Sequence, residues 1–591
     1  MKYRPAVIVI MLIVVSANLF AQKYDEQITV VAPFEPSVSD ANKISSEPQQ
    51  FSVDIEKSNF DYIYTSFLGS TAMITPTGIA ILDAGKYNGL SKKHIFYSKL
   101  GFGSNLEPFA HICVNSINND KLSGGFSISH NSAWRQMDVL ADNTYSNTNF
   151  DIYGNAKIKN TLLQLDAYYK HNMLHYFGLD TSYVATDILA DTNLSQTYHR
   201  TGAKLTITNI KTANFAYDVS AKYDYLQDDF YYSQHEFSLP MNFTFFTKWF
   251  GKKVQNEKLN FNLNANFCSV QDANYSNLVY NLFLIDFEPS YSLTVGAFCF
   301  KLGVDVDFYN DKSQSTENYF KIHPAVEINT TVVPDAFSLR IGAKGDAHRN
   351  TISSLFDECK YIAPALVLRD NYNQRYNQFK DKDYNVFPTT VTNEAYNIYA
   401  FFDTRFGNFI NFSTGVEFVK TENKAFFLSN AVEVNNVKVN QFDVVFDDIN
   451  QTIISADLTI SNNKNLIFSL NGKYFVNQLT DGEDLKYPYN LFDFEIYSLL
   501  KYTFGNDKIS VGLQGFLLGP SVDVACFSPT ADYFERPIMG DMGITGSYAI
   551  KKNIALWLNL NNLLHYNNKM MLYYAYPEYP ANVMAGVTIS L

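Results

Sequence analysis

A two-residue alternation of apolar and polar side chains repeats along most of this chain. Its clearest example is the run at 259–267, LNFNLNANF, in which apolar residues alternate with Asn260, Asn262, Asn264 and Asn266. Comparable runs occupy residues 163–170, 454–460, 466–474, 509–514 and 554–561. Successive side chains of a strand point to opposite faces, so each run predicts a strand with one apolar and one polar face. About ten residues is also the length that a tilted strand needs to cross a membrane.

The segments between these runs fall into two kinds. Short turn signals stand at residues 119–120, 159–160, 505–507 and 551–553, and longer polar stretches at 134–147, 180–196, 371–393 and 480–489. Outer-membrane barrels have short periplasmic turns and long extracellular loops. The sequence therefore predicts an all-β fold, a transmembrane antiparallel β-barrel of 16–22 strands spanning residues 91–591.

A soluble β-sandwich or propeller is the alternative fold. Its strands would typically have about five or six residues, and a chain of this size would normally be divided into domains or repeats. The composition also favours a barrel, because the chain holds 41 Tyr and 48 Phe. Aromatic girdles and a polar lumen account for this combination of aromatic and polar residues, and in lipid only a closed barrel lets strands pair all their backbone groups.

The first 22 residues have the pattern of a signal peptide. Lys2 and Arg4 precede an apolar run at 6–15, and the small residue Ala21 marks the expected cleavage site. The alternative, a membrane anchor, would need about 20 apolar residues. Export to the outer membrane is therefore predicted. Residues 23–90 lack sustained alternation and are interpreted as an N-terminal periplasmic or lumenal arm.

Charge and cysteine content exclude some classes of function. The formal net charge is −13, and removal of Lys2 and Arg4 with the signal peptide lowers it by two, to −15. Such an acidic chain is not expected to bind nucleic acid. The five cysteines are scattered and form no CxxC motif, so neither a disulfide framework nor a zinc site is expected. We interpret them as isolated small apolar residues.

The last twelve residues, PANVMAGVTISL, predict the closing strand of the barrel. Alternate apolar positions are expected to face lipid and to form the assembly signal: Val583, Ala585, Val587, Ile589 and Leu591. The asparagines of 259–267 would face the lumen. An amide-rich wall suits hydroxylated solutes, but any barrel interior also needs polar residues, and both interpretations stay open.

The sequence holds little that points to catalysis or to a bound metal. His171 and His175 share a face of a predicted strand but would lie ~13 Å apart, too far to bind one metal. The segments 130–132 (HNS) and 180–182 (DTS) contain triad residue types, but a triad is recognised by geometry rather than by local sequence. We therefore expect no enzyme activity, no cofactor and no metal.

Several motifs resemble a known family. They are V-x-P-F-x-P at 31–36, LGFG at 100–103 with Pro108, HNS at 130–132, and the ending at 559–591. Together these are similar to the TonB-dependent-receptor-like outer-membrane barrels of Bacteroidota. The resemblance implies contact with outer-membrane lipid and with the barrel-assembly machinery, and a partnership with TonB or another periplasmic or outer-membrane protein.

The chain departs from that family in two respects. It ends in Leu591 rather than in an aromatic residue, and residues 23–90 are too few for the usual plug domain, so the resemblance is to a plugless member. The segment Ile28, Thr29, Val30 and Val31 looks like a TonB box, which pairs with its partner as an added strand. An ordinary flexible N-terminus is the alternative interpretation.

Three functions are compatible with these features. The first is a passive or partner-gated conduit for small polar solutes, or the membrane part of an envelope transport complex. The second is a structural or assembly protein with a blocked lumen that binds other envelope proteins. The third is a TonB-coupled importer. An open lumen favours the first, whereas an obstructed lumen with an apolar loop patch favours the second.

Overall fold

The computed structural model describes residues 95–591 with gaps. Within this range the structure does not describe residues 117–120, 136–140, 181–193, 211–213, 230–231, 252, 273–277, 312–316, 334–335, 363–390, 408, 435–436, 463–464, 481–484, 506–507, 529–532 and 565–572. The predicted signal peptide at 1–22, the whole predicted arm at 23–90 with its TonB-box-like segment at 28–31, and the predicted barrel boundary at 91 all lie outside the described residues.

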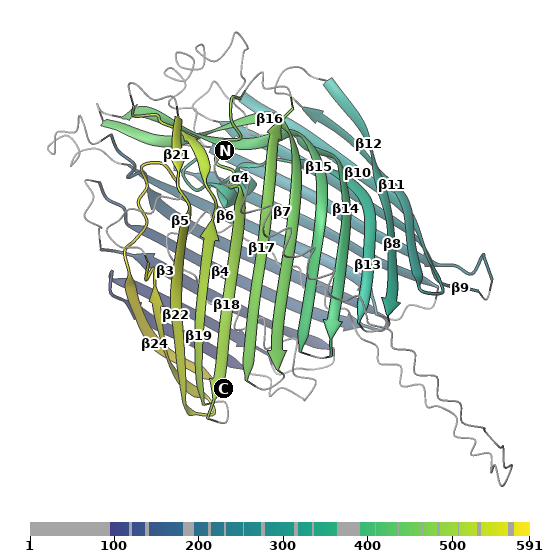
Figure 1. Ribbon diagram of the computed structural model, residues 1–591, viewed down its shortest axis with the longest axis horizontal. Coiled ribbons are helices and arrows are strands. Elements are labelled where there is room, and N and C mark those ends of the chain that lie inside the picture. Colours follow the sequence, from purple (N-terminus) through teal and green to yellow (C-terminus); the bar gives the residue numbers. More distant parts are fainter. Residues whose placement is uncertain are drawn as a thin grey trace, which may run out of the picture. The chain divides into compact units, whose positions relative to one another are not determined.

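Twenty-two strands form one closed antiparallel sheet (Figure 1). Each strand pairs with its neighbours along the chain, and β1 pairs with β24 from Tyr97↔Ser590 to Gly103↔Met584, which closes the barrel. The predicted fold is confirmed, and the strand number lies at the upper limit of the predicted range.

The elements of this fold have the following bounds: β1 (Phe96–Gly103), β2 (Glu107–Asn115), β3 (Leu122–Ala133), β4 (Tyr145–Ile158), β5 (Thr161–His175), β6 (Ser195–Asn209), β7 (Phe215–Asp228), β8 (Tyr232–Phe246), β9 (Val254–Asp272), β10 (Leu278–Val295), β11 (Phe298–Asp311), β12 (Glu317–Val333), β13 (Phe337–Arg349), α4 (Ile352–Glu358), β14 (Val391–Phe406), β15 (Ile410–Val434), β16 (Val437–Asn462), β17 (Leu466–Leu479), β18 (Phe494–Phe504), β19 (Ile509–Leu518), β20 (Ser521–Val524), β21 (Tyr533–Arg536), β22 (Met539–Lys551), β23 (Ile554–Asn561) and β24 (Asn582–Ser590). Strands β20 and β21 pair with each other in a separate ribbon.

Short and long connections alternate between the two ends of the barrel. The links β4–β5, β18–β19 and β22–β23, where turn signals were predicted, are short and lie at one end. The long predicted loops follow β3, β5, β13 and β17 at the other end. Short turns of such barrels face the periplasm, so we call their end the inner rim and the end with the long loops the outer mouth.

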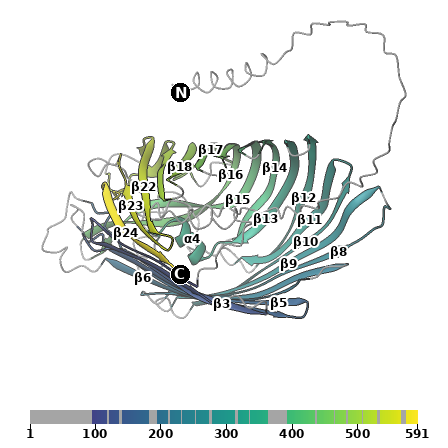
Figure 2. The ribbon, with the colours of Figure 1, turned by 90° about the horizontal axis from the view of Figure 1, so that it is seen from below.

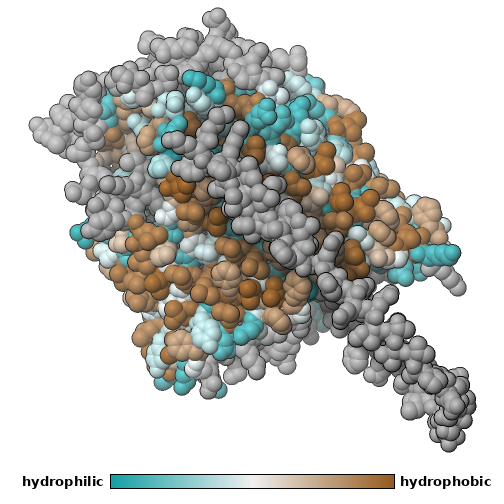
Figure 3. Space-filling view, in the orientation of Figure 1, coloured by the Kyte–Doolittle hydropathy of each residue, from teal (hydrophilic) through white to brown (hydrophobic). Residues whose placement is uncertain are grey.

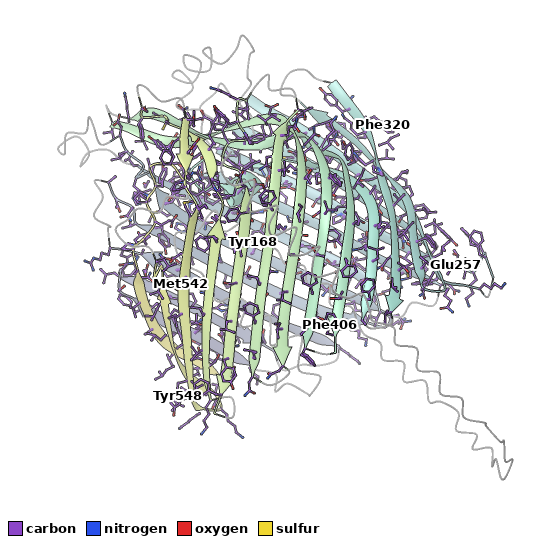
Figure 4. The ribbon with its side chains drawn as sticks, in the orientation of Figure 1. Tyr168, Glu257, Phe320, Phe406, Met542 and Tyr548 are labelled. Atoms are coloured by element: carbon purple, nitrogen blue, oxygen red, sulfur yellow. The ribbon has the colours of Figure 1, made fainter. Side chains whose placement is uncertain are left out.

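The outside of the barrel is apolar. Residues such as Val511, Leu513 and Leu517 point outward from β19, and Figure 3 shows apolar surface over much of the barrel face turned to the viewer. Exposed aromatic residues stand at both ends of the strands, with Phe406 and Tyr548 near the inner rim and Phe320 near the outer mouth (Figure 4). This is the surface that a membrane-spanning barrel presents to lipid.

Strand β24 alternates between the two faces of the wall. Val583 and Leu591 are exposed, whereas Met584 is buried beside Trp557 of β23. Val587 is paired with Leu100 and with Leu556 of the neighbouring strands. All five cysteines are free. Among the described residues, no helix is long and apolar enough to cross a membrane.

A charged residue on the lipid-facing side of β24 is expected to impair the barrel. We expect Val587→Arg to destabilise it by about 2–4 kcal/mol, because position 587 lies near the middle of a membrane-crossing strand. Thr588→Arg places the same charge on the opposite face of the wall and is expected to cost far less. Unfolding in urea of the two refolded variants measures the difference, and equal losses would contradict the assigned facing.

Candidate functional site: a lumen cavity and an outer cap

The β15–β16 hairpin is much longer than the barrel wall requires. Strand β15 has 25 residues and β16 has 26, but β16 pairs with β17 only from Ile449 onward, and β15 pairs with β14 only as far as Glu422. A bulge lies between Thr421 and Lys424, where Asn423 has a φ of 53°. Bulges bend a strand, and residues 424–434 and 437–447 leave the wall beyond it as a two-stranded ribbon. The segment 424–447 is here called the outer hairpin.

The outer hairpin crosses the mouth of the barrel. Val439 forms a bridge with Leu179, which follows β5, and β5 stands ten strands away from β15 in a ring of 22. The Asn440 amide donates to the Gly178 carbonyl at 2.7 Å, and the Asp180 amide donates to the Lys438 carbonyl at 3.1 Å. The hairpin therefore joins opposite walls, and Figure 1 shows its strands running across the upper end of the barrel.

Helix α4 packs beneath this crossing, inside the ring of strands (Figure 2). Thr351 caps the helix in a capping box with Ser354. Such a cap satisfies amides that would otherwise lack partners at a helix N-terminus. The Ile352 amide donates to the Gln234 side chain of β8 at 3.0 Å. Leu355 is buried, and the Phe356 ring lies 4.2 Å from the ring of Tyr198 on β6.

An aromatic cluster holds the crossing segments together. Tyr576, from the connection between β23 and β24, stacks on Tyr361 at 3.8 Å between ring centroids and meets Phe177 edge-on at 4.9 Å. Its hydroxyl donates to the Asn440 carbonyl. The backbone amide of Phe442 donates to the Tyr361 carbonyl at 2.9 Å. Aromatic pairs of this kind add about 0.5–1.5 kcal/mol each beyond the burial of their area.

A buried ion pair fixes the other side of the outer hairpin. Asp523 on β20 is 0% exposed, and Arg536 on β21, 2% exposed, donates to its carboxylate at 3.0 Å. The Ser429 hydroxyl and amide of the outer hairpin donate to the same carboxylate at 3.0 and 3.3 Å. Burial raises the pKa of the Asp523 carboxyl, and the positive charge of Arg536 opposes that shift.

These segments form one packed layer over the mouth. We call it the outer cap, and it consists of residues 176–180, 351–362, the outer hairpin, 521–524, 533–536 and 573–580. Its buried apolar side chains form two clusters, which draw on loops from the whole length of the barrel. The sequence did not indicate this layer, although the alternation at 424–447 runs on beyond what a membrane crossing needs.

The stability of the outer cap is expected to fall as the pH rises from about 4 through 7. Burial raises the pKa of Asp443 from 3.8 to about 7, opposed by a hydrogen bond from Asn430. Burial also raises the pKa of Glu578 from 4.5 to about 7, opposed by the charge of Lys360. A carboxyl with a raised pKa in the folded state contributes stability below its unfolded pKa and loses it as pH rises through the folded value.

Amide hydrogen exchange of the outer hairpin measures this effect. After correction for intrinsic rates, protection should be lower at pH 8 than at pH 5. Asp443→Asn should make the profile shallower, because the amide cannot ionise and its oxygen can still accept from Asn430, while Glu578 still ionises. Protection that rises with pH would contradict the expected sign.

A polar cavity of about 990 Å³ lies along the inner faces of β8 to β15. Three of the four asparagines predicted to face the lumen, Asn262, Asn264 and Asn266, line it, and Asn266 donates to Glu236 at 2.7 Å. The fourth, Asn260, accepts from the Thr244 hydroxyl at 3.0 Å. Eight Asp or Glu side chains and four Lys or Arg side chains line the cavity. The cavity wall is therefore acidic as well as rich in amides.

The histidines and triad-type residues singled out in the sequence have separate surroundings among the described residues. The ring centroids of His171 and His199 lie 5.2 Å apart. The Nδ1 atom of His175 lies 2.8 Å from the Thr144 carbonyl oxygen. His130 lies 3.0 Å from the hydroxyl of Ser132, but its other ring nitrogen meets the Thr148 hydroxyl at 2.8 Å rather than a carboxylate. The orienting acid of a triad is thus replaced by a hydroxyl. Residues 181–182 lie outside the described residues.

Comparison with solved structures shows where this fold occurs. The FrpB iron transporter of Neisseria meningitidis has a TM-score of 0.61 at 12% identity, over 85% of this chain and 82% of that chain. The ferric enterobactin receptor PfeA of Pseudomonas aeruginosa gives 0.60 at 10% identity, over 84% and 80%. The ferric-catecholate import receptor Fiu of E. coli gives 0.60 at 9% identity, over 85% and 82%.

The chain shares the barrel fold of these transporters and receptors. At such low identity the likeness concerns the fold alone, and it agrees with the resemblance of the sequence motifs to receptor-like barrels. No family model and no curated protein matches the sequence.

Proposed function

We propose that the protein is an outer-membrane transport barrel whose lumen conducts small polar solutes and whose outer cap gates the mouth. The observation that carries this proposal is the polar cavity inside a 22-stranded barrel, beneath a layer built from the barrel's own loops. Barrels of this size enclose a lumen that transporters keep plugged. The outer cap takes the place of such a closure at the outer end.

Opening requires the outer hairpin to separate from the far wall. The contacts that hold it there include two backbone hydrogen bonds with residues 178–180, one with Tyr361, and the aromatic cluster around Tyr576. A solute or a partner that binds the separated state more tightly would shift the equilibrium toward it. The conduit is therefore gated rather than permanently open.

The remaining parts of the proposal follow from the sequence. The chain would be exported with cleavage of residues 1–22, inserted by the barrel-assembly machinery, and anchored in outer-membrane lipid as a plugless relative of the TonB-dependent receptors of Bacteroidota. Ile28–Val31 would offer a strand to TonB or another periplasmic partner that transmits the opening signal. No enzymatic step is part of this function.

A structural or assembly role with a blocked lumen is the second candidate. The apolar core of the outer cap favours it, because a packed layer over the mouth also suits a barrel that passes nothing. The two candidates differ in what happens once the outer hairpin is shortened. A conduit then carries ions, whereas a barrel blocked below the cap does not.

Ion selectivity tests the conduit. In a shortened-hairpin variant, residues 427–444 are replaced by Asn-Gly. Its reversal potential in a planar bilayer under a salt gradient is expected to show cation preference, because acidic side chains dominate the cavity wall. Glu417→Gln in the same background should weaken that preference. A properly folded variant that carries no current would favour the structural role.

A further inference from the structure

Four carboxylates converge on one patch of the inner wall. Asp286 stands on β10, Asp305 and Asp307 on β11, and Asp346 on β13. Each offers one oxygen, and these oxygens all lie within 4.8 Å of one another. The spacing of two residues places Asp305 and Asp307 on the same face of β11, and Asp286 is paired directly with Asp307 across the sheet.

Two of these side chains are buried with oxygens that lack a hydrogen bond. Asp307 is 0% exposed, and its Oδ1 has no hydrogen-bond partner. Asp305 is 4% exposed, and its Oδ1 also has none. A buried carboxylate oxygen without a partner bears its full desolvation cost. A bound cation would reduce that cost for both residues.

Three cationic side chains of strands β11 to β13 are engaged elsewhere. Lys301 pairs with Glu288 at 2.6 Å, and Lys321 pairs with Glu422 at 2.9 Å. Arg349 donates to two backbone carbonyls at 2.8 Å. Among the ion pairs of the described strands, His323 alone reaches the cluster, with its Nε2 3.0 Å from Asp307 Oδ2.

We propose that these four aspartates bind a calcium ion in the lumen wall. Carboxylate oxygens are the ligands of hard cations, and Ca²⁺ takes six to eight of them at about 2.3–2.6 Å. Ligands on opposite sides of such an ion lie about 4.6–5.2 Å apart, so the four oxygens fit around one centre. Mg²⁺ would draw opposite ligands to about 4.0–4.2 Å and demands stricter octahedral geometry. Water from the cavity completes the coordination.

His323 acts as a positioning residue for this site. Its Nδ1 lies 3.3 Å from the Ala395 carbonyl oxygen, which holds Nε2 toward Asp307. The register of β14 shifts between Glu394 and Tyr396, so Ala395 lies in a bulge. Outer-shell contacts of this kind orient metal ligands, and bulges re-aim the groups around them.

The ion can reach its site from the lumen. Asp286, Asp305 and Asp346 all line the cavity described above, and Asp346 is exposed to it. The proposal goes beyond transport, since the site would bind calcium whether or not the lumen carries a solute. Bound calcium would tie β10, β11 and β13 together and reduce the negative charge of the wall.

Calorimetric titration of the full mature protein tests the site. The protein is refolded in detergent without lipopolysaccharide, stripped with a chelator and titrated with CaCl₂ in the presence of a tenfold excess of Mg²⁺. We expect one calcium per chain. Asp346→Asn removes the exposed ligand with little risk to folding and should weaken binding by about tenfold or more. Asp307→Asn, if it folds, should do the same.

Glu417→Gln is the matched control. It removes one negative charge from the same cavity but lies outside the cluster, and its partner Asn397 can still donate to the amide oxygen. Binding of this variant should equal that of the wild type. No calcium binding by the folded wild-type protein would overturn the proposal. Equal weakening by Glu417→Gln and Asp346→Asn would also overturn it, because that result indicates diffuse attraction rather than ligation.

Discussion

Shortening the outer hairpin is expected to turn a closed barrel into a permeable one. Phe426 and Val445 are paired directly, so an Asn-Gly turn in place of residues 427–444 joins them with the favoured two-residue hairpin connection. The change removes Val439, Asn440 and Phe442, and with them the bridges to the opposite wall and to the segment after α4. The barrel strands keep all their pairings.

Swelling of proteoliposomes in neutral sugars of graded size measures this permeability. The shortened-hairpin protein should admit small sugars at rates at least about tenfold above the intact protein, since water-filled lumens of large barrels pass such solutes. Asn436→Gly is the control, because it gives the full-length hairpin the same Asn-Gly sequence at positions 435 and 436. Equal swelling by the intact and shortened proteins would mean that the outer hairpin does not close the mouth.

Removal of the Arg536 side chain is expected to loosen the outer cap by about 3–5 kcal/mol. That is the usual cost of leaving one member of a buried ion pair without its partner. Asp523 would keep its hydrogen bonds from Ser429 but lose the cation that neutralises it. Native-state hydrogen exchange of the outer hairpin amides in Arg536→Ala reports the loss, and amides of the barrel wall should hardly change.

A double substitution separates the ion pair from simple loss of packing. Arg536→Met with Asp523→Leu removes both charges and restores apolar volume, and such replacements are often neutral or stabilising. Its outer hairpin should be protected almost as well as that of the wild type. Loss of protection in the double variant as large as in Arg536→Ala would show that the charge of Arg536 contributes nothing.

The barrel could be predicted because its signal is local. A strand such as residues 259–267 shows its two faces in its own alternation, and the length of each run reports the membrane thickness it must cross. The division into short turns and long loops is likewise visible in the sequence. The number of strands was bounded only loosely, because alternation does not show whether a strand pairs within the wall: β20 and β21 pair only with each other.

The outer cap depends on contacts that no local pattern reveals. Val439 meets Leu179 across 260 residues of chain, and Tyr576 reaches Asn440 from the last long loop. The aspartate cluster was missed for a related reason. The pair at 305 and 307 is visible as two acidic residues on one strand face, but the approach of Asp346 follows from how four neighbouring strands, β10 to β13, are set beside each other.

Single-channel conductance of the refolded mature protein tests most directly whether the outer cap closes the barrel. The recording is made in a planar bilayer with the complete mature chain and with a form that lacks residues 23–90, both with the outer cap intact. Neither form should show steady large conductance, since the loops themselves close the mouth. Steady large conductance from either form would contradict the closure and assign the outer cap a different role.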